Sequence, residues 1–459
     1  MGIEDFNISR NNYYSKESVS NNKNINLGKI SLNNLPNSLA QNNEIETNDI
    51  SNINKENKLL NSPKLSSTSL FSFINSTETN NIDPEKIEKM KKSPYSYFRA
   101  TNDEFRKNIL EDPKLKELMK TSTDDITIQG DAHLENVGAY KKDDGKLGFG
   151  FNDFDDSIKG SYKMDVGRLT TSIRFMAKEK GLNDSQVESL VKEFLTTYKN
   201  KISEYNKDKS KEPNYDNNKL IFKLNEKINS DNGNFIKERT VVDPITNESK
   251  FNYNPPPATP EDPNPKVKSG FKEIKDKVIK DKVEKAIDLN SLAKKLGVDP
   301  KDLKITDIAN RTAGTASLGS DRYAILVENS KTNPKSQIIL DMKEAKDPTN
   351  TRNAMKEYLG SNSDFGETQM DNKKFYIKEL SAIGKNIEVD KDKDPAKINT
   401  KMTDLVDAIA EMMAKKHVDF GQGDKIQSET DNLEKDITDF SKIMYDKLVN
   451  SYEKFKNEN

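Results

Sequence analysis

Two short polar stretches carry most of the information in this sequence: GDAHLENVG at residues 130–138 and NDFDD at residues 152–156. The first follows a short apolar run, Ile126–Ile128, and the second ends another strand pattern, Leu147–Phe151. Gly145 lies at a turn just before that second strand. This order predicts a polar loop, then a β-hairpin, then an acidic strand end.

The residue types in these stretches suit phosphoryl transfer. That reaction needs a carboxylate to orient or deprotonate the acceptor hydroxyl, and an amide and a second carboxylate to hold magnesium against the phosphates. Asp131 and Asn136 are five residues apart, and Asp153 follows at the strand end. We therefore predict a catalytic group of Asp131, Asn136 and Asp153, with oxygen ligands for Mg²⁺ from Asn136 and Asp153. The alternative is that these residues only form turns.

Neighbouring polar residues have two interpretations each. Asp155 adds a metal ligand or, with Asp156, caps the next helix. His133 lies at the acceptor site or fixes the loop by a hydrogen bond. Asp165 and Arg168 are expected to form a structural pair under the loop.

A glycine-rich stretch, GTASLG at residues 314–319, lies between two strand patterns. Such a hairpin can offer backbone N–H groups to a triphosphate, although a plain β-turn has the same pattern. Lys343 follows on the next strand, where a kinase places its phosphate-binding lysine, and the helix after it offers Glu357 as the partner of that lysine. Glu344 and Glu367 are alternative partners.

The order of these parts is unusual, because protein kinases place the glycine-rich loop and lysine before the catalytic aspartate. Here the catalytic loop lies near residue 131 and the glycine-rich loop near residue 314. Both fit one chain only if the two lobes are circularly permuted. The helix expected at residues 402–417 would then pack beside Asp131.

Five segments together resemble the bacterial domain-of-unknown-function 2252 family, which is similar to aminoglycoside-phosphotransferase-like kinases. They span residues 88–420, with a poorly matched middle insertion. The segments are residues 93–99, 130–138, 152–169, 307–323 and 375–380.

This resemblance implies a circularly permuted, two-lobed, protein-kinase-like α+β fold that binds ATP and Mg²⁺. By position it gives Gly314, Ser317 and Gly319 to the phosphate loop. Lys343 becomes the phosphate-binding lysine. Three residues depart from the expected pattern: Gln129 replaces a histidine, Ala316 a glycine and Lys378 an arginine.

Composition divides the chain into ordered and disordered parts. Only 32% of the 459 residues are hydrophobic, and 19 of the first 80 are Asn, so residues 1–82 are expected to be disordered. The remaining boundaries are 83–205 and 386–459 for the helical lobe, 206–300 for an insertion and lobe connection, and 301–385 for a nucleotide-binding β-rich lobe.

The net charge and the missing residue types narrow the possible binding partners and metal sites of the chain. The net charge of −2 gives no pull toward nucleic acid or membrane, and the absence of Cys with only two His excludes thiolate and multi-histidine metal sites. We expect a cytoplasmic chain with an unknown small-molecule or protein acceptor. Adenylyl transfer, a non-catalytic pseudokinase and a translocated effector, secreted without a signal, are the alternatives.

Overall fold

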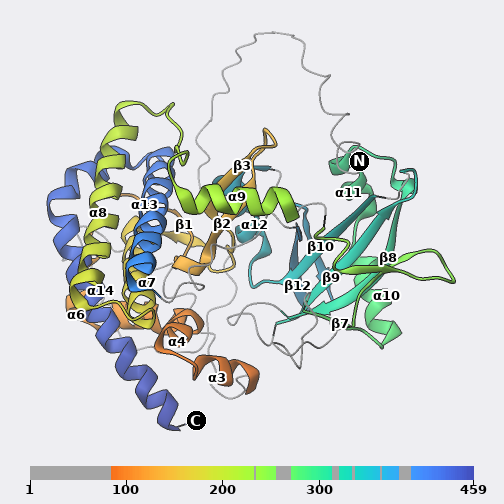
Figure 1. Ribbon diagram of the computed structural model, residues 1–459, viewed down its shortest axis with the longest axis horizontal. Helices are drawn as coiled ribbons and strands as arrows, with labels where there is room; N and C mark the ends of the chain where they lie inside the picture. The colour runs from red at the N-terminus through yellow and green to blue at the C-terminus, as the bar shows by residue number, and fades with distance from the viewer. Residues whose placement is uncertain are drawn as a thin grey trace, which may run out of the picture.

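The computed structural model describes residues 84–231, 234–254, 270–312, 320–332, 336–361, 364–381 and 394–458. A helical region and a sheet region lie side by side, with short hairpins between them (Figure 1). The predicted α+β class is therefore confirmed. The expected disordered tail, residues 1–82, lies outside the described residues.

The helical region is dominated by four long helices, seen at the left of Figure 1. Their apolar residues recur at helical spacing, and α8 begins with a capping box between Asn183 and Gln186. Shorter helices α3 to α6 complete the region. The bounds are α7 (Tyr162–Glu179), α8 (Asp184–Lys207), α13 (Pro395–Asp419), α14 (Gly423–Glu458), α3 (Pro84–Met90), α4 (Pro94–Ala100), α5 (Asn102–Glu111) and α6 (Pro113–Leu118).

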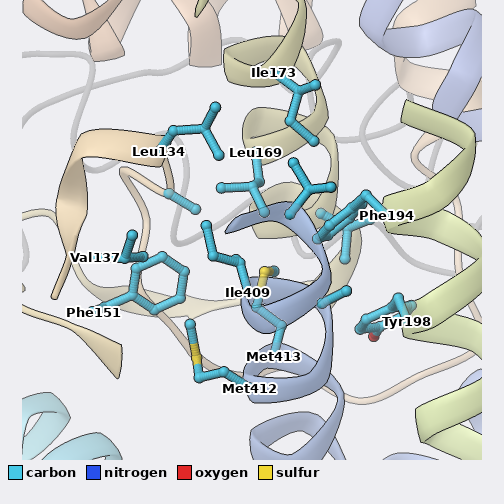
Figure 2. Close-up of a cluster of buried hydrophobic side chains, with 14 of the residues drawn as sticks. Leu134, Val137, Phe151, Leu169, Ile173, Phe194, Tyr198, Ile409, Met412 and Met413 are labelled. Atoms are coloured by element: carbon cyan, nitrogen blue, oxygen red, sulfur yellow. The ribbon is translucent and has the colours of Figure 1, made fainter. Parts of the chain in front are cut away.

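The main core joins the predicted catalytic loop to the C-terminal helices. Leu134 of the loop and Val137 share one buried cluster with Ile409 and Met413 of α13, as Figure 2 shows. Each such side chain contributes roughly 1.5–3 kcal/mol by leaving water. The helix at residues 402–417 therefore packs beside the loop, despite its distance in sequence.

Two small two-stranded sheets lie between the regions. Strand β1 (Ile126–Ile128) pairs antiparallel with β4 (Ile158–Gly160), and the consecutive strands β2 (Val137–Lys141) and β3 (Leu147–Phe151) form a hairpin. Gly145 turns this hairpin with a φ of 85°, which favours glycine.

The sheet region contains a six-stranded antiparallel sheet among the described residues, in the order β11-β12-β10-β9-β8-β7. Helices α10 and α11 cover one face, and the hairpin of β5 and β6 packs Phe251 on the other. The bounds are β5 (Thr240–Val242), β6 (Ser249–Phe251), β7 (Phe271–Glu273), α10 (Lys277–Ala286), α11 (Leu289–Leu296), β8 (Leu303–Arg311), β9 (Arg322–Asn329), β10 (Ser336–Glu344), α12 (Pro348–Leu359), β11 (Glu367–Met370) and β12 (Lys373–Glu379), with α9 (Lys219–Asp231) between the regions.

Candidate functional site

The loop at residues 129–131 is fixed through its backbone. Asp165 of α7 accepts hydrogen bonds from the backbone N–H groups of Gln129 at 2.7 Å and Gly130 at 2.9 Å. Gly130 has a φ of 83°, and a Cβ there would lie 2.0 Å from the Asp156 carbonyl oxygen. Only glycine fits this position without a backbone shift.

Helix α5 holds the same loop from its other side. Asn102 and Arg106 each donate a hydrogen bond at 3.0 Å to the Gly130 carbonyl oxygen. Arg106 also donates to the Asp156 carbonyl oxygen at 2.9 Å, so it joins the loop to the NDFDD segment. The loop is thereby positioned by buried groups that do not depend on a ligand.

The carboxylate of Asp131 is buried and bound by Arg168. Arg168 Nε donates to Asp131 Oδ1 at 2.6 Å, and its guanidinium lies over the ring of Phe98 at 4.3 Å. Burial raises the pKa of Asp131 to about 7, although the Arg168 charge acts to lower it. A carboxyl group with such a pKa can take up a proton near neutral pH.

His133 lies beside this carboxylate, with Nε2 3.7 Å from Asp131 Oδ2. Burial lowers the pKa of His133 well below its usual range, so the imidazole is neutral at pH 7. Its Nδ1 is buried without a hydrogen-bond partner in the described structure. His133 is therefore a polar group next to the predicted base, with one nitrogen available.

Asn136 and Asp153 are brought to the Asp131 loop by the β2–β3 hairpin. Asn136 Nδ2 donates to the Asp131 carbonyl oxygen at 3.4 Å, and the Asn152 N–H donates to the Asn136 carbonyl oxygen at 3.2 Å. Gln129 Nε2 adds a bond of 2.5 Å to the Asp153 carbonyl oxygen. The two polar stretches found in the sequence therefore lie together.

Lys343 of β10 connects the sheet to this group. Its Nζ lies 3.2 Å from Asp153 Oδ2 and also forms an ion pair with Asp155 Oδ2. Lys343 is 3% exposed, whereas the Asp153 side chain is 42% exposed. The lysine is thus a buried cation, and the Asp153 side chain is only partly enclosed.

The pKa values of Asp153 and Asp155 are shifted in opposite directions. Burial alone would raise the pKa of Asp153, but the charges of Lys343 and Lys378 outweigh it and hold that pKa below its usual range. Burial and the neighbouring Asp153 charge raise the pKa of Asp155 above its usual range. Asp153 is therefore the more acidic of the two carboxyl groups.

A second charged group lies two residues before Lys343. Asp341 is fully buried, and Arg322 Nε and Arg311 Nη1 each donate to it at 2.8 Å. Strand register places Arg322 opposite Lys343. Four cations (Arg311, Arg322, Lys343 and Lys378) therefore gather at this end of the sheet, and we did not predict the two arginines.

The described structure places Glu357 away from Lys343. Glu357 lies 4.0 Å from Lys159 on the outer side of α12, because Thr351, Ala354 and Tyr358 form the buried face of that helix. Of the alternatives, Glu344 lies 3.1 Å from Lys373 and Glu367 lies 3.1 Å from Arg352. The described partners of Lys343 are instead Asp153 and Asp155.

Asp165 and Arg168 also differ from the expected pair. Each contacts the loop separately, Asp165 through backbone N–H groups and Arg168 through the Asp131 carboxylate. Gly314, Ser317 and Gly319 lie outside the described residues, which flank that loop at Thr312 and Ser320.

The oxygen donors suit magnesium better than a metal that needs many protein ligands. Among the described residues, no group of three or more His, Cys, Asp or Glu side chains could hold a metal ion. Mg²⁺ needs only one or two carboxylates besides water and phosphate oxygens. Asp155 Oδ1 is buried without a hydrogen-bond partner in the described structure, so the donor set fits this ion.

Comparisons with known proteins give one family. A family model described as "Uncharacterized protein conserved in bacteria (DUF2252)" matches residues 80–458. Neither a curated protein nor a solved structure matches the chain. Among the described helices, none is long and apolar enough to cross a membrane.

Proposed function

We propose that this chain, which belongs to the DUF2252 family, is a phosphotransferase that binds ATP with magnesium and acts on an unknown acceptor. The observation that carries the proposal is the contact of Lys343 with Asp153 and Asp155, across 190 residues of sequence. Kinases place a lysine and a metal-binding aspartate together at the phosphates of ATP.

The order of elements supports a kinase-like, circularly permuted arrangement. The described elements from β8 to β12 are strand, strand, strand with Lys343, helix, strand and strand, and the glycine-rich residues 314–319 fall between the first two strands in sequence. A kinase begins with its glycine-rich loop, its lysine strand and a helix, in this order. The packing of α13 beside the Asp131 loop supports joining this part to the helical region as a second lobe.

In this proposal the nucleotide is held by charges from both regions. Lys343 and Arg322 would contact phosphate oxygens, and Asn136, Asp153 and Asp155 would hold magnesium. The ion supplies charge neutralisation between the phosphates when bound. The glycine-rich loop at residues 314–319 would offer its N–H groups to the phosphates.

Asp131 acts on the acceptor. It orients the acceptor hydroxyl and takes its proton as the oxygen bonds to the γ-phosphorus. The bond from that phosphorus to the β–γ bridging oxygen breaks, and ADP leaves with the electron pair. A base whose pKa is near 7 suits this step at neutral pH. ATP is a cytoplasmic metabolite, so the proposal requires that compartment.

A non-catalytic nucleotide-binding protein is the second candidate. Arg168 occupies Oδ1 of Asp131, and Asp131 is only 7% exposed, so the base is partly enclosed. Such a chain would bind Mg·ATP through the same lysine and aspartates without transferring phosphate.

Labelled ATP separates the two candidates. The full chain is incubated with ATP labelled at the γ-phosphate and with metabolite and lysate fractions, and transfer of label is measured. Asp131→Asn should lower turnover by about 10²–10⁴ and leave Mg·ATP binding nearly intact. Asp144→Asn, at the exposed tip of the β2–β3 hairpin, is the matched control and should leave turnover unchanged. Full turnover in Asp131→Asn would contradict its assignment as the base.

A further inference from the structure

A cavity with a volume of about 540 Å³ lies outside the proposed nucleotide site. Its walls come from the β2–β3 hairpin, residues 212–216, α9 and the last turns of α13. Sites for small molecules usually have volumes of about 300–1,000 Å³. The cavity therefore has the size of a small-molecule site.

Aromatic side chains form much of the wall. Tyr140 and Phe149 come from the hairpin, and the ring of Tyr215 meets Phe149 edge to face with centroids 5.5 Å apart. Phe222 of α9 also lines the cavity and is 57% exposed, an unusual exposure for a large apolar side chain. These rings suit a flat apolar ligand.

One lysine of the wall has no carboxylate partner. The Tyr215 hydroxyl, in contrast, is enclosed by protein and has no hydrogen-bond partner in the described structure, so only the ring of Tyr215 contributes to the wall. Lys416 Nζ donates to the Glu357 carbonyl oxygen at 3.3 Å, and no carboxylate among the described residues lies within ion-pair distance of it.

Two carboxylates of the wall already pair with a lysine. Lys415 lies 2.6 Å from Asp419 and 3.8 Å from Glu212, so its charge is compensated. Asp216 is exposed. Lys142 and Lys416 are the other cations of the wall, and we choose Lys416 to receive the acidic group because no carboxylate among the described residues pairs with it.

We propose that this cavity binds a small aromatic acid, with its ring against Tyr140, Phe149 and Tyr215 and its acidic group at Lys416. The acid can be a carboxylate, a sulfonate or a phosphate. This site is independent of the proposed nucleotide chemistry, because none of its residues belongs to the Asp131–Lys343 group.

The probe is 1-anilinonaphthalene-8-sulfonate, an aromatic sulfonate whose fluorescence rises in apolar surroundings. The full chain should bind it saturably at one site. Lys416→Gln should raise the dissociation constant at least tenfold, since a hydrogen bond to a charged group is lost. Asn225→Trp, which fills the cavity from α9, should abolish binding. Lys397→Gln is the control for Lys416→Gln, because Lys397 lies on an exposed part of α13, the helix that also carries Lys416. It should leave the dissociation constant unchanged.

Phe222→Ala guards against variants that simply unfold. This side chain lines the cavity and is 57% exposed, so the variant should keep the melting temperature while weakening binding two- to fivefold. Wild-type affinity in Lys416→Gln and Asn225→Trp, or no saturable binding by the full chain, would overturn the proposal.

Discussion

Two aspartates, one in each region, are equally buried, but their pKa values are shifted in opposite directions. Asp165 of the helical region is 1% exposed and accepts hydrogen bonds from backbone N–H groups, and burial raises its pKa to about 6. Asp341 of the sheet region is 0% exposed, but Arg322 and Arg311 outweigh the effect of burial and hold its pKa well below its usual range. Direct cationic partners, and not burial alone, decide which carboxylate stays charged.

This difference assigns a separate task to each region. The helical region holds carboxyl groups that exchange protons near neutral pH, Asp131 above all. The sheet region holds fixed charges, with Lys343 and Arg322 at the end of the two central strands nearest Asp153. In our proposal the first region handles the acceptor proton and the second the phosphates.

The largest effect should come from removing the C-terminal helices. A chain ending at Asn399 loses most of α13 and all of α14, and with them the partners of Leu134, Val137 and Phe105 in the core. We expect the helical region to unfold, which solubility and circular dichroism would report. A truncated chain that stays folded and binds ATP normally would contradict the joining of the Asp131 loop to these helices.

A smaller effect concerns pH. Between about pH 4 and 7 the folded chain keeps a proton on Asp131 that the unfolded chain releases near pH 4, so this group makes the free energy of unfolding fall as pH rises. Asn cannot titrate. The stability of Asp131→Asn relative to wild type should therefore improve by about 1–3 kcal/mol from pH 4.5 to 7.5, measured by urea unfolding.

Asp341→Asn is the matched control from the other region. The pKa of Asp341 lies below this window, so the cost of leaving Arg311 and Arg322 without their carboxylate, about 3–5 kcal/mol, should be the same at each pH. If the stabilities of both variants relative to wild type change by the same amount between about pH 4.5 and 7.5, the contrast between the two regions is wrong.

The smallest effect is expected for Glu357→Gln. Its contact with Lys159 is exposed and 4.0 Å long, so the free energy of unfolding should change by less than about 0.5 kcal/mol and the Mg·ATP affinity should not change. Thermal unfolding measures the first quantity and calorimetry the second. A tenfold weaker affinity would mean that Glu357 reaches the nucleotide.

Local sequence order was sufficient to place the parts of the site that follow one another in the chain. The loop, the hairpin with Gly145 and the strand end at Asp153 were all predicted, because short strands and turns have local signals. Glu357 shows the limit of that reasoning. The apolar positions Ala354, Met355 and Tyr358 already mark the buried face of the helix, and Glu357 is not on it.

Contacts between distant segments could not be predicted in the same way. Nothing near Arg168 in the sequence indicates that it binds Asp131, because the contact depends on how α7 crosses the loop. The position of Asp341 did carry a signal. It lies two residues before Lys343 on a strand, so both side chains share one face of the sheet. The alternation of side chains along a strand predicts that Asp341 and Lys343 share a face of the sheet. It does not predict that Arg311 and Arg322 contact Asp341 there.

The most direct test of the central claim is whether Mg·ATP stabilises the full chain through Asp153. At about 100 times its dissociation constant, the ligand should add about 2.7 kcal/mol to the free energy of unfolding and raise the melting temperature. Asp153→Asn should lose the magnesium-dependent part of that rise, while Asp144→Asn should retain it. A melting temperature that does not change with ATP, ADP and magnesium would contradict the proposed nucleotide site.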